Sequence, residues 1–236
     1  WDWPPNAGDL ITEVLRNRGA DLEDRALAAE MAGDTVVVND ALAGELLRIL
    51  ENDGEAEELR GSAAIALGPA LEQSDTGGTT DDDEDDDLAV IGQAMFDRIR
   101  LTLRRLYQDI SLPAGLRRRI LEAAVRADGP WQRDAVRAAY ANQADEWRLT
   151  AVFCMGYVEG FEEAILDSLK STNQNIRFQA LHAAGNWKLD RAWPQVSALA
   201  RSAKTDKTLL LAAMEAIAEI RPADAIEILV RLLNSD

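Results

Sequence analysis

The sequence predicts an all-α fold, an α-α superhelix of about six stacked helix pairs that forms a single domain over residues 1–236. Alanine and leucine dominate the 47% of apolar residues, and aromatic residues make up only 6%. Apolar residues recur at steps of three and four along the chain, as they do on the buried face of a helix. A short pattern also returns at intervals that fit one helix pair, and such internal repetition is typical of helical arrays.

The repeated pattern is ten residues long and is clearest in "IRFQALHAAG" at 176–185. It consists of an apolar residue, Arg, two variable positions, Ala, an apolar residue, one variable position, two small or apolar residues and Gly. Successive copies start 35, 57, 31, 29 and 33 residues apart. The third copy keeps only the Arg, and the sixth loses both Arg and Gly. The six copies occupy residues 24–33, 59–68, 116–125, 147–156, 176–185 and 209–218.

This Arg-x-x-Ala-x-x-x-x-Gly pattern, placed on the second helix of each pair, resembles the HEAT repeat. It is most similar to the short bacterial type called phycobilisome-lyase HEAT-like repeats. The resemblance covers nearly the whole chain, and residues 70–110 are its least regular part. It implies a superhelix whose second helices line a concave face, which most members of the family use to bind other macromolecules.

The constant positions of the pattern predict a packing framework. The small or apolar residues at the fifth, sixth and eighth positions are expected to form the core between helix pairs, and the eighth includes the lone cysteine, Cys154. The tenth-position glycines fit helix ends, where a left-handed residue is tolerated. The arginines at the second position are interpreted as a ladder of ion pairs between repeats. These residues are Arg25, Arg60, Arg117, Arg148 and Arg177, with glycines at Gly33, Gly68, Gly156 and Gly185.

The third, seventh and eleventh positions are chemically free, and their spacing of four places them along one face of each second helix. In the fourth and fifth copies they form an apolar and aromatic patch, which we expect to face the concave groove and bind a protein or peptide. The alternative is that these side chains pack against an adjacent helix or a second copy of the chain. The predicted contact residues are Leu149, Phe153, Tyr157, Phe178 and His182, with Arg118, Glu122 and Arg126 on one side and Glu215 and Glu219 on the other.

An acidic flexible insertion is predicted at 72–87, between the second and third copies. It contains seven consecutive acids at 81–87, and its spacing does not match a calcium-binding loop. The following segment, 98–137, has ten arginines against four acids. Either the acidic tract folds back on this basic segment, or the segment binds an anionic partner that the tract excludes.

Catalytic motifs are not recognisable in the sequence, so we expect no enzymatic activity, no cofactor and no metal. Deoxyhypusine hydroxylases resemble this architecture but use paired His and Glu motifs for iron, and this chain has one histidine. The alternative function is nucleic-acid binding of the kind seen in HEAT-like alkylpurine DNA glycosylases, which the chain resembles in its helical repeats. It would use the Arg98–Arg137 segment with Trp131 or Trp147.

The overall charge and composition favour a protein partner in an aqueous compartment. A net charge of −17 disfavours binding to a nucleic-acid backbone. The chain has no apolar run of membrane-spanning length, and one cysteine cannot form an internal disulfide. We therefore expect a cytoplasmic protein that binds a protein or peptide, with no membrane contact and with nucleic acid as an unlikely partner.

Overall fold

The computed structural model describes residues 3–4, 6–34, 36–75, 91–202 and 204–233, and all regular structure within them is helical. The chain forms two compact units, Trp1–Gln132 and Arg133–Asp236, each of which is described by itself. The sequence predicted one domain over the same length. Helix α7 (Pro130–Tyr140) contains the boundary between the units.

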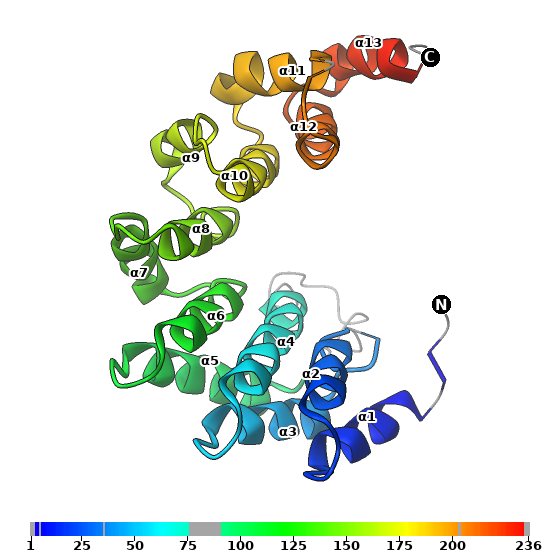
Figure 1. Cartoon of the computed structure of the whole chain (residues 1–236), viewed down its shortest axis with the longest axis vertical. Helices are drawn as coiled ribbons and strands as arrows, with labels where there is room; N and C mark the ends of the chain where they lie inside the picture. Colours follow the sequence, from blue (N-terminus) through cyan, green and yellow to red (C-terminus); the bar gives the residue numbers. More distant parts are fainter. Residues whose placement is uncertain (1–2, 5, 35, 76–90, 203, 234–236) are drawn as a thin grey trace, which may run out of the picture. The chain divides into compact units, whose positions relative to one another are not determined.

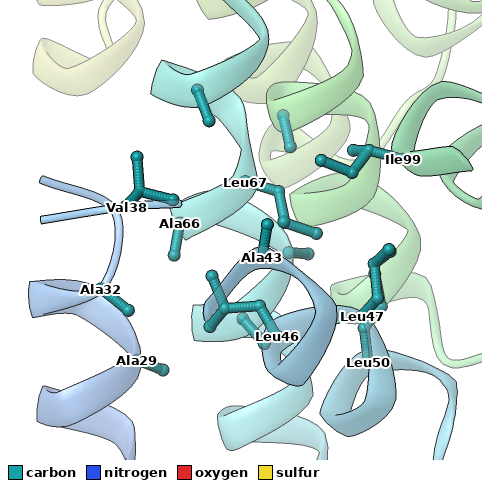
Figure 2. Close-up of a cluster of buried hydrophobic side chains, with 14 of the residues drawn as sticks. Ala29, Ala32, Val38, Ala43, Leu46, Leu47, Leu50, Ala66, Leu67 and Ile99 are labelled. Atoms are coloured by element: carbon teal, nitrogen blue, oxygen red, sulfur yellow. The ribbon is translucent and has the colours of Figure 1, made fainter. Parts of the chain in front are cut away.

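In the first unit the helices alternate between two layers (Figure 1). The first helices of the pairs are α1 (Ala7–Arg16), α3 (Asp40–Glu51) and α5 (Gln93–Gln108). The second helices are α2 (Leu22–Met31), α4 (Glu57–Asp75) and α6 (Ala114–Ala124), of which α4 contacts both α2 and α6. Figure 2 shows part of the core between the layers, where Leu46, Leu47 and Leu50 of α3 lie near Leu67 of α4 and Ile99 of α5.

The second unit has the same plan. Its second helices are α8 (Asp145–Cys154), α10 (Gln174–Asn186) and α12 (Lys207–Ile220), and α10 contacts both of the others. They pack with the first helices α9 (Glu162–Ser168) and α11 (Trp193–Arg201), a 3-10 turn at Asp190–Ala192 and the last helix, α13 (Pro222–Leu233). The predicted all-α fold of repeated helix pairs is confirmed within each unit, with α13 as an additional helix.

Local signals in the sequence explain where several helices begin. The Asn39 side chain accepts a hydrogen bond from the backbone amide of Leu42 at 3.0 Å, and Asn173 and Asp206 cap α10 and α12 in the same way. Pro130 and Pro222 are the first residues of α7 and α13, where a missing amide donor costs nothing. Capping side chains and prolines of the sequence therefore mark the starts of these five helices.

The tenth-position glycines serve a different purpose from the one predicted. Among the described glycines only Gly160 has a positive φ, so the repeated glycines are not left-handed caps. Each instead lies against the eighth-position residue of the next copy: a Cβ on Gly185 would be 3.2 Å from Ala216 Cα, and one on Gly156 would be 3.8 Å from Ala183 Cα. These glycines are needed because neighbouring second helices approach closely.

The repeated arginines also differ from the prediction. Arg25, Arg60 and Arg117 each donate from Nε to the backbone carbonyl ten residues earlier, at the end of the first helix of their own pair. The acceptors are Leu15, Leu50 and Tyr107, at 3.2, 2.9 and 2.9 Å. The arginine therefore closes its own helix pair by binding carbonyls at a helix C-terminus. Ion pairs to the next pair are formed by Arg25 with Glu55 and by Arg148 with Asp167.

The predicted core positions are buried except for the eighth-position Met31 and the sixth-position Met214, which is only partly buried. Cys154 and the fifth-position alanines are buried, but the eighth-position Met31 is 37% exposed. Ala66, Ala123, Ala183 and Ala216 each lie against the glycine of the preceding copy in the same unit, whereas none of the described helices precedes α2 in this layer. The predicted insertion at 72–87 is described only in part. Residues 72–75 form the last turn of α4, and the acidic tract at 81–87 lies outside the described residues.

Candidate functional site

The predicted contact residues divide between the two units. Leu149 and Phe153 lie on α8, Tyr157 follows it, and Phe178 and His182 lie on α10, so these five are in the second unit. Arg118 and Glu122 lie on α6, and Arg126 follows it, in the first unit. The apolar and aromatic residues thus lie on α8 and α10, two helices in contact within the second unit. The three charged residues belong to the first unit and are described with it.

The aromatic side chains of the second unit form two pairs, each along one helical turn. The ring centroids of Phe153 and Tyr157 are 5.4 Å apart, and those of Phe178 and His182 are 4.5 Å apart in an edge-on arrangement. All four residues are partly buried, with their remaining surface open to solvent. Contacts between rings hold each side chain in place, which lowers the entropy lost when such a side chain binds a partner.

Leu211 on α12 extends this surface. It occupies the third position of the sixth copy, the same position as Leu149 and Phe178, and it is 50% exposed. We call Leu149, Phe153, Tyr157, Phe178, His182 and Leu211 the inner face of the second unit. The sequence pattern contained the signal for Leu211, but its copy lacks Arg and Gly and is one of the two weakest.

Acidic groups lie beside this inner face on α12. His182 Nδ1 is 3.9 Å from Glu215 Oε2, and Lys188 Nζ is 3.9 Å from Glu219 Oε2. The side chains of Glu215 and Glu219 are 68% and 60% exposed, so both pairs are well solvated and contribute little to stability. The inner face therefore passes from aromatic side chains on α8 and α10 to carboxylates on α12.

The three charged residues of the first unit have structural contacts. Glu122 is close to Arg119, at 3.3 Å, and its side chain is mostly buried. Arg126 Nη1 is 2.8 Å from Glu72 Oε2, and a Cβ on Gly68 would lie 2.5 Å from Arg126 Cδ. Arg126 thus fills space that Gly68 leaves open. Arg118 lines a hollow between α2, α4 and α6.

Most arginines of the 98–137 segment are engaged within the chain. Arg100 donates to the Asp128 carbonyl at 2.6 Å, and Arg105 pairs with Glu51 at 2.5 Å. Trp131 packs against Tyr107, with ring centroids 5.3 Å apart. Guanidinium groups that already bind carboxylates and carbonyls are less available to phosphates, and this does not favour the nucleic-acid alternative.

Two further properties concern metals and membranes. Within the described ranges, no group of three or more His, Cys, Asp or Glu side chains is arranged to hold a metal ion. In the same part of the chain, no helix is long and apolar enough to cross a membrane.

Comparison with solved structures places this fold among HEAT-like helical repeats. A chain from the complex of CpcE and CpcF of phycocyanin lyase from Nostoc sp. PCC7120 is similar, with a TM-score of 0.52 and 17% identity. The match covers 98% of this chain and 95% of that one. Human deoxyhypusine hydroxylase has a TM-score of 0.41 and 16% identity over 99% of this chain and 80% of its own. A designed armadillo repeat protein has a TM-score of 0.43 and 12% identity, with coverages of 90% and 99%.

No protein-family model matches the sequence, and no curated protein matches it. The prediction that the chain is not an enzyme is wrong, because the helical-repeat architecture does not exclude enzymatic activity. The fold is shared with a subunit of phycocyanin lyase, so a chain of stacked helix pairs without a familiar catalytic motif can belong to an enzyme. The error came from treating the lack of recognisable motifs as evidence about activity.

Proposed function

We propose that this chain binds a partner protein or peptide through the inner face of the second unit. The observation that carries the proposal is the apolar row Leu149, Phe178 and Leu211, which runs across α8, α10 and α12 and is only partly buried. Ordered aromatic and leucine side chains that remain open to solvent are typical of the central contacts of a protein interface. Binding of this kind would serve a scaffold and an enzyme subunit equally.

The similar solved chain supports a protein partner, because it was determined as part of a complex between two proteins, CpcE and CpcF. The buried single cysteine also agrees with a reducing compartment, and we propose a cytoplasmic location on this basis. Within the inner face, Phe153 and Phe178 would be the main anchors, with His182 and Tyr157 at their edges.

The test uses the full chain as bait for proteins from its source cells. Wild type is compared with Phe153→Ala/Phe178→Ala and with the control Ile226→Ala, which removes an apolar side chain that is 63% exposed on α13. We expect a partner that wild type and the control capture equally and that the double variant loses. Circular dichroism of the double variant should show unchanged helical content.

Two results would contradict the proposal. Equal capture by all three proteins would place the binding surface elsewhere. Loss of helical structure in the double variant would show that the two rings belong to the core, and Tyr157→Ala, at the end of α8, would then test the face without removing them.

A further inference from the structure

The first unit contains a hollow of about 500 Å³ on the face of its second helices that bears the third and seventh positions of the repeat. Its floor is formed by Gly61 and Ile65 of α4 with Leu116 of α6. Charged side chains surround it in an ordered way: Glu30 on α2, Glu57 and Glu58 on α4, and Arg118 and Arg119 on α6. Because α4 lies between α2 and α6, the charge changes from acidic to basic across the three helices.

Gly61 at the floor of the hollow is unlike the glycines that pack between helices. A Cβ on Gly61 would meet only Arg119 Cγ, at the ordinary contact distance of 3.5 Å. The packing of α4 therefore does not require glycine here, and glycine inside a helix lowers its stability relative to alanine. The absence of a side chain at Gly61 leaves the floor of the hollow open.

Two carboxylates of the acidic wall are accessible to a ligand. Glu30 and Glu58 are exposed, and neither forms an ion pair with any residue that the structure describes. Glu57 has a separate use, because its Oε1 would lie 2.5 Å from a Cβ on Gly115, in the first turn of α6, where a carboxylate is favoured by the helix dipole. On the basic wall, Arg119 lies 3.3 Å from Glu122, but its side chain is 59% exposed and lines the hollow, so part of the guanidinium can still meet a ligand.

We propose that this hollow binds a peptide segment carrying one basic and one acidic side chain. The basic group would lie between Glu30 and Glu58, and the acidic group would meet Arg118 and Arg119. Adjacent helices pack about 8–10 Å apart, and an extended peptide rises about 3.3 Å per residue. From the midpoint between α2 and α4 to α6 is about one and a half helix spacings, or ~12–15 Å. The two charged residues of the bound segment are therefore about four residues apart, a spacing that also places both side chains on the same face of an extended peptide. This site is separate from the inner face of the second unit and does not depend on it.

The test follows backbone amide signals of the full chain by NMR as peptides are added. The probe is the blocked peptide acetyl-Arg-Ala-Ala-Ala-Glu-amide, and the matched controls replace Arg by citrulline or Glu by Gln. We expect saturable shifts at the amides of Gly61 and Gly115 with the probe. Each neutral replacement should weaken binding by about threefold or more, and added salt should weaken the probe alone.

Variants of the chain complete the test. Glu58→Gln should weaken the probe, whereas Glu23→Gln, an exposed acid on α2 outside the hollow, should not. Gly61→Leu should fill the floor and abolish the shifts at Gly115; if that variant does not fold, the Glu58→Gln result decides alone. The proposal is overturned if the citrulline and Gln peptides bind as well as the probe, or if no saturable shift occurs at either glycine.

Discussion

Gly33 lies so close to Ala66 that a Cβ at position 33 would be 2.8 Å from the Ala66 Cα. The other near atoms are the Ala66 carbonyl oxygen, at 3.0 Å, and its Cβ, at 3.2 Å. Backbone atoms cannot move aside as a flexible side chain can. The contact therefore fixes how closely α2 and α4 approach, and the same pairing of a glycine with the eighth-position alanine of the next copy recurs at Gly185 and Ala216.

The first prediction concerns this glycine. Gly33→Ala should lower the free energy of unfolding by about 1–3 kcal/mol, because the added methyl group overpacks the contact between α2 and α4. The matched control is Gly44→Ala within α3, where a Cβ would meet Met95 Cε at 3.6 Å, an ordinary contact. That variant should raise the free energy of unfolding by about 0.5–1 kcal/mol, the gain in helix propensity. Urea denaturation followed by circular dichroism measures both, and a stabilised Gly33→Ala would refute the close-contact explanation.

The sequence predicted the fold well because the packing positions repeat. Small residues at the fifth and eighth positions, in all copies but Ile120 of the third and Met31 of the first, identify the buried side of the second helices before any coordinates are known. The tenth position is informative in a further way: it is glycine at Gly33, Gly68, Gly156 and Gly185, but Val125 in the third copy, shortly before the first unit ends at Gln132. The template thus loses its close-contact glycine next to the boundary between the units.

The sequence could not predict in which direction a side chain points or how closely two helices approach. A pattern places Arg60 on a helix but does not say that Nε turns back to the Leu50 carbonyl of its own pair. The pattern marks Gly33 as constant and Gly61 as variable, but it does not say that a Cβ at position 33 would meet backbone atoms whereas position 61 has room for one. Contacts at these positions are set by the distance between helices, which periodicity does not encode.

The second prediction is a pH dependence of stability. Arg25 donates two hydrogen bonds to Glu55, at 2.7 and 3.0 Å, and both side chains are at most 8% exposed. These hydrogen bonds hold the pKa of the Glu55 carboxyl below its ordinary value. Since folding lowers this pKa, the stabilisation is complete above the pKa of the unfolded chain and is lost as the pH falls through the pKa of the folded state.

Glu55→Gln should therefore cost about 1.5–3 kcal/mol at pH 7, the usual contribution of a charge-assisted hydrogen bond. The difference from wild type should shrink as the pH falls below about 4. Asp134→Asn is the control, because the Asp134–Arg137 pair is 82% and 63% exposed and should contribute little. A difference between wild type and Glu55→Gln that stays constant from pH 7 to pH 3 would contradict the assignment.

The third prediction concerns Lys188, which follows α10 with a φ of 47°. The amide of Leu189 bonds the Ala184 carbonyl at 2.9 Å, so Lys188 occupies the left-handed position of a helix-ending motif that usually contains glycine. Lys188→Gly should stabilise the chain by about 1 kcal/mol, which raises the midpoint of thermal unfolding by about 2–4 °C. Lys188→Ala keeps the strained conformation and should give no such increase.

The fourth prediction separates the inner face from the core by comparing two positions of one helix. Leu181 is fully buried in α10, and Leu181→Ala should cost about 2–5 kcal/mol. Phe178 lies three residues earlier, is partly exposed and contacts His182 edge-on. Phe178→Ala should cost less, about 1–2.5 kcal/mol, because it removes one ring contact and only part of a buried side chain. Urea denaturation of the two variants measures the difference. If Phe178→Ala were as destabilising as Leu181→Ala, the ring would be part of the packed interior, and the inner face of the second unit would lack its central anchor.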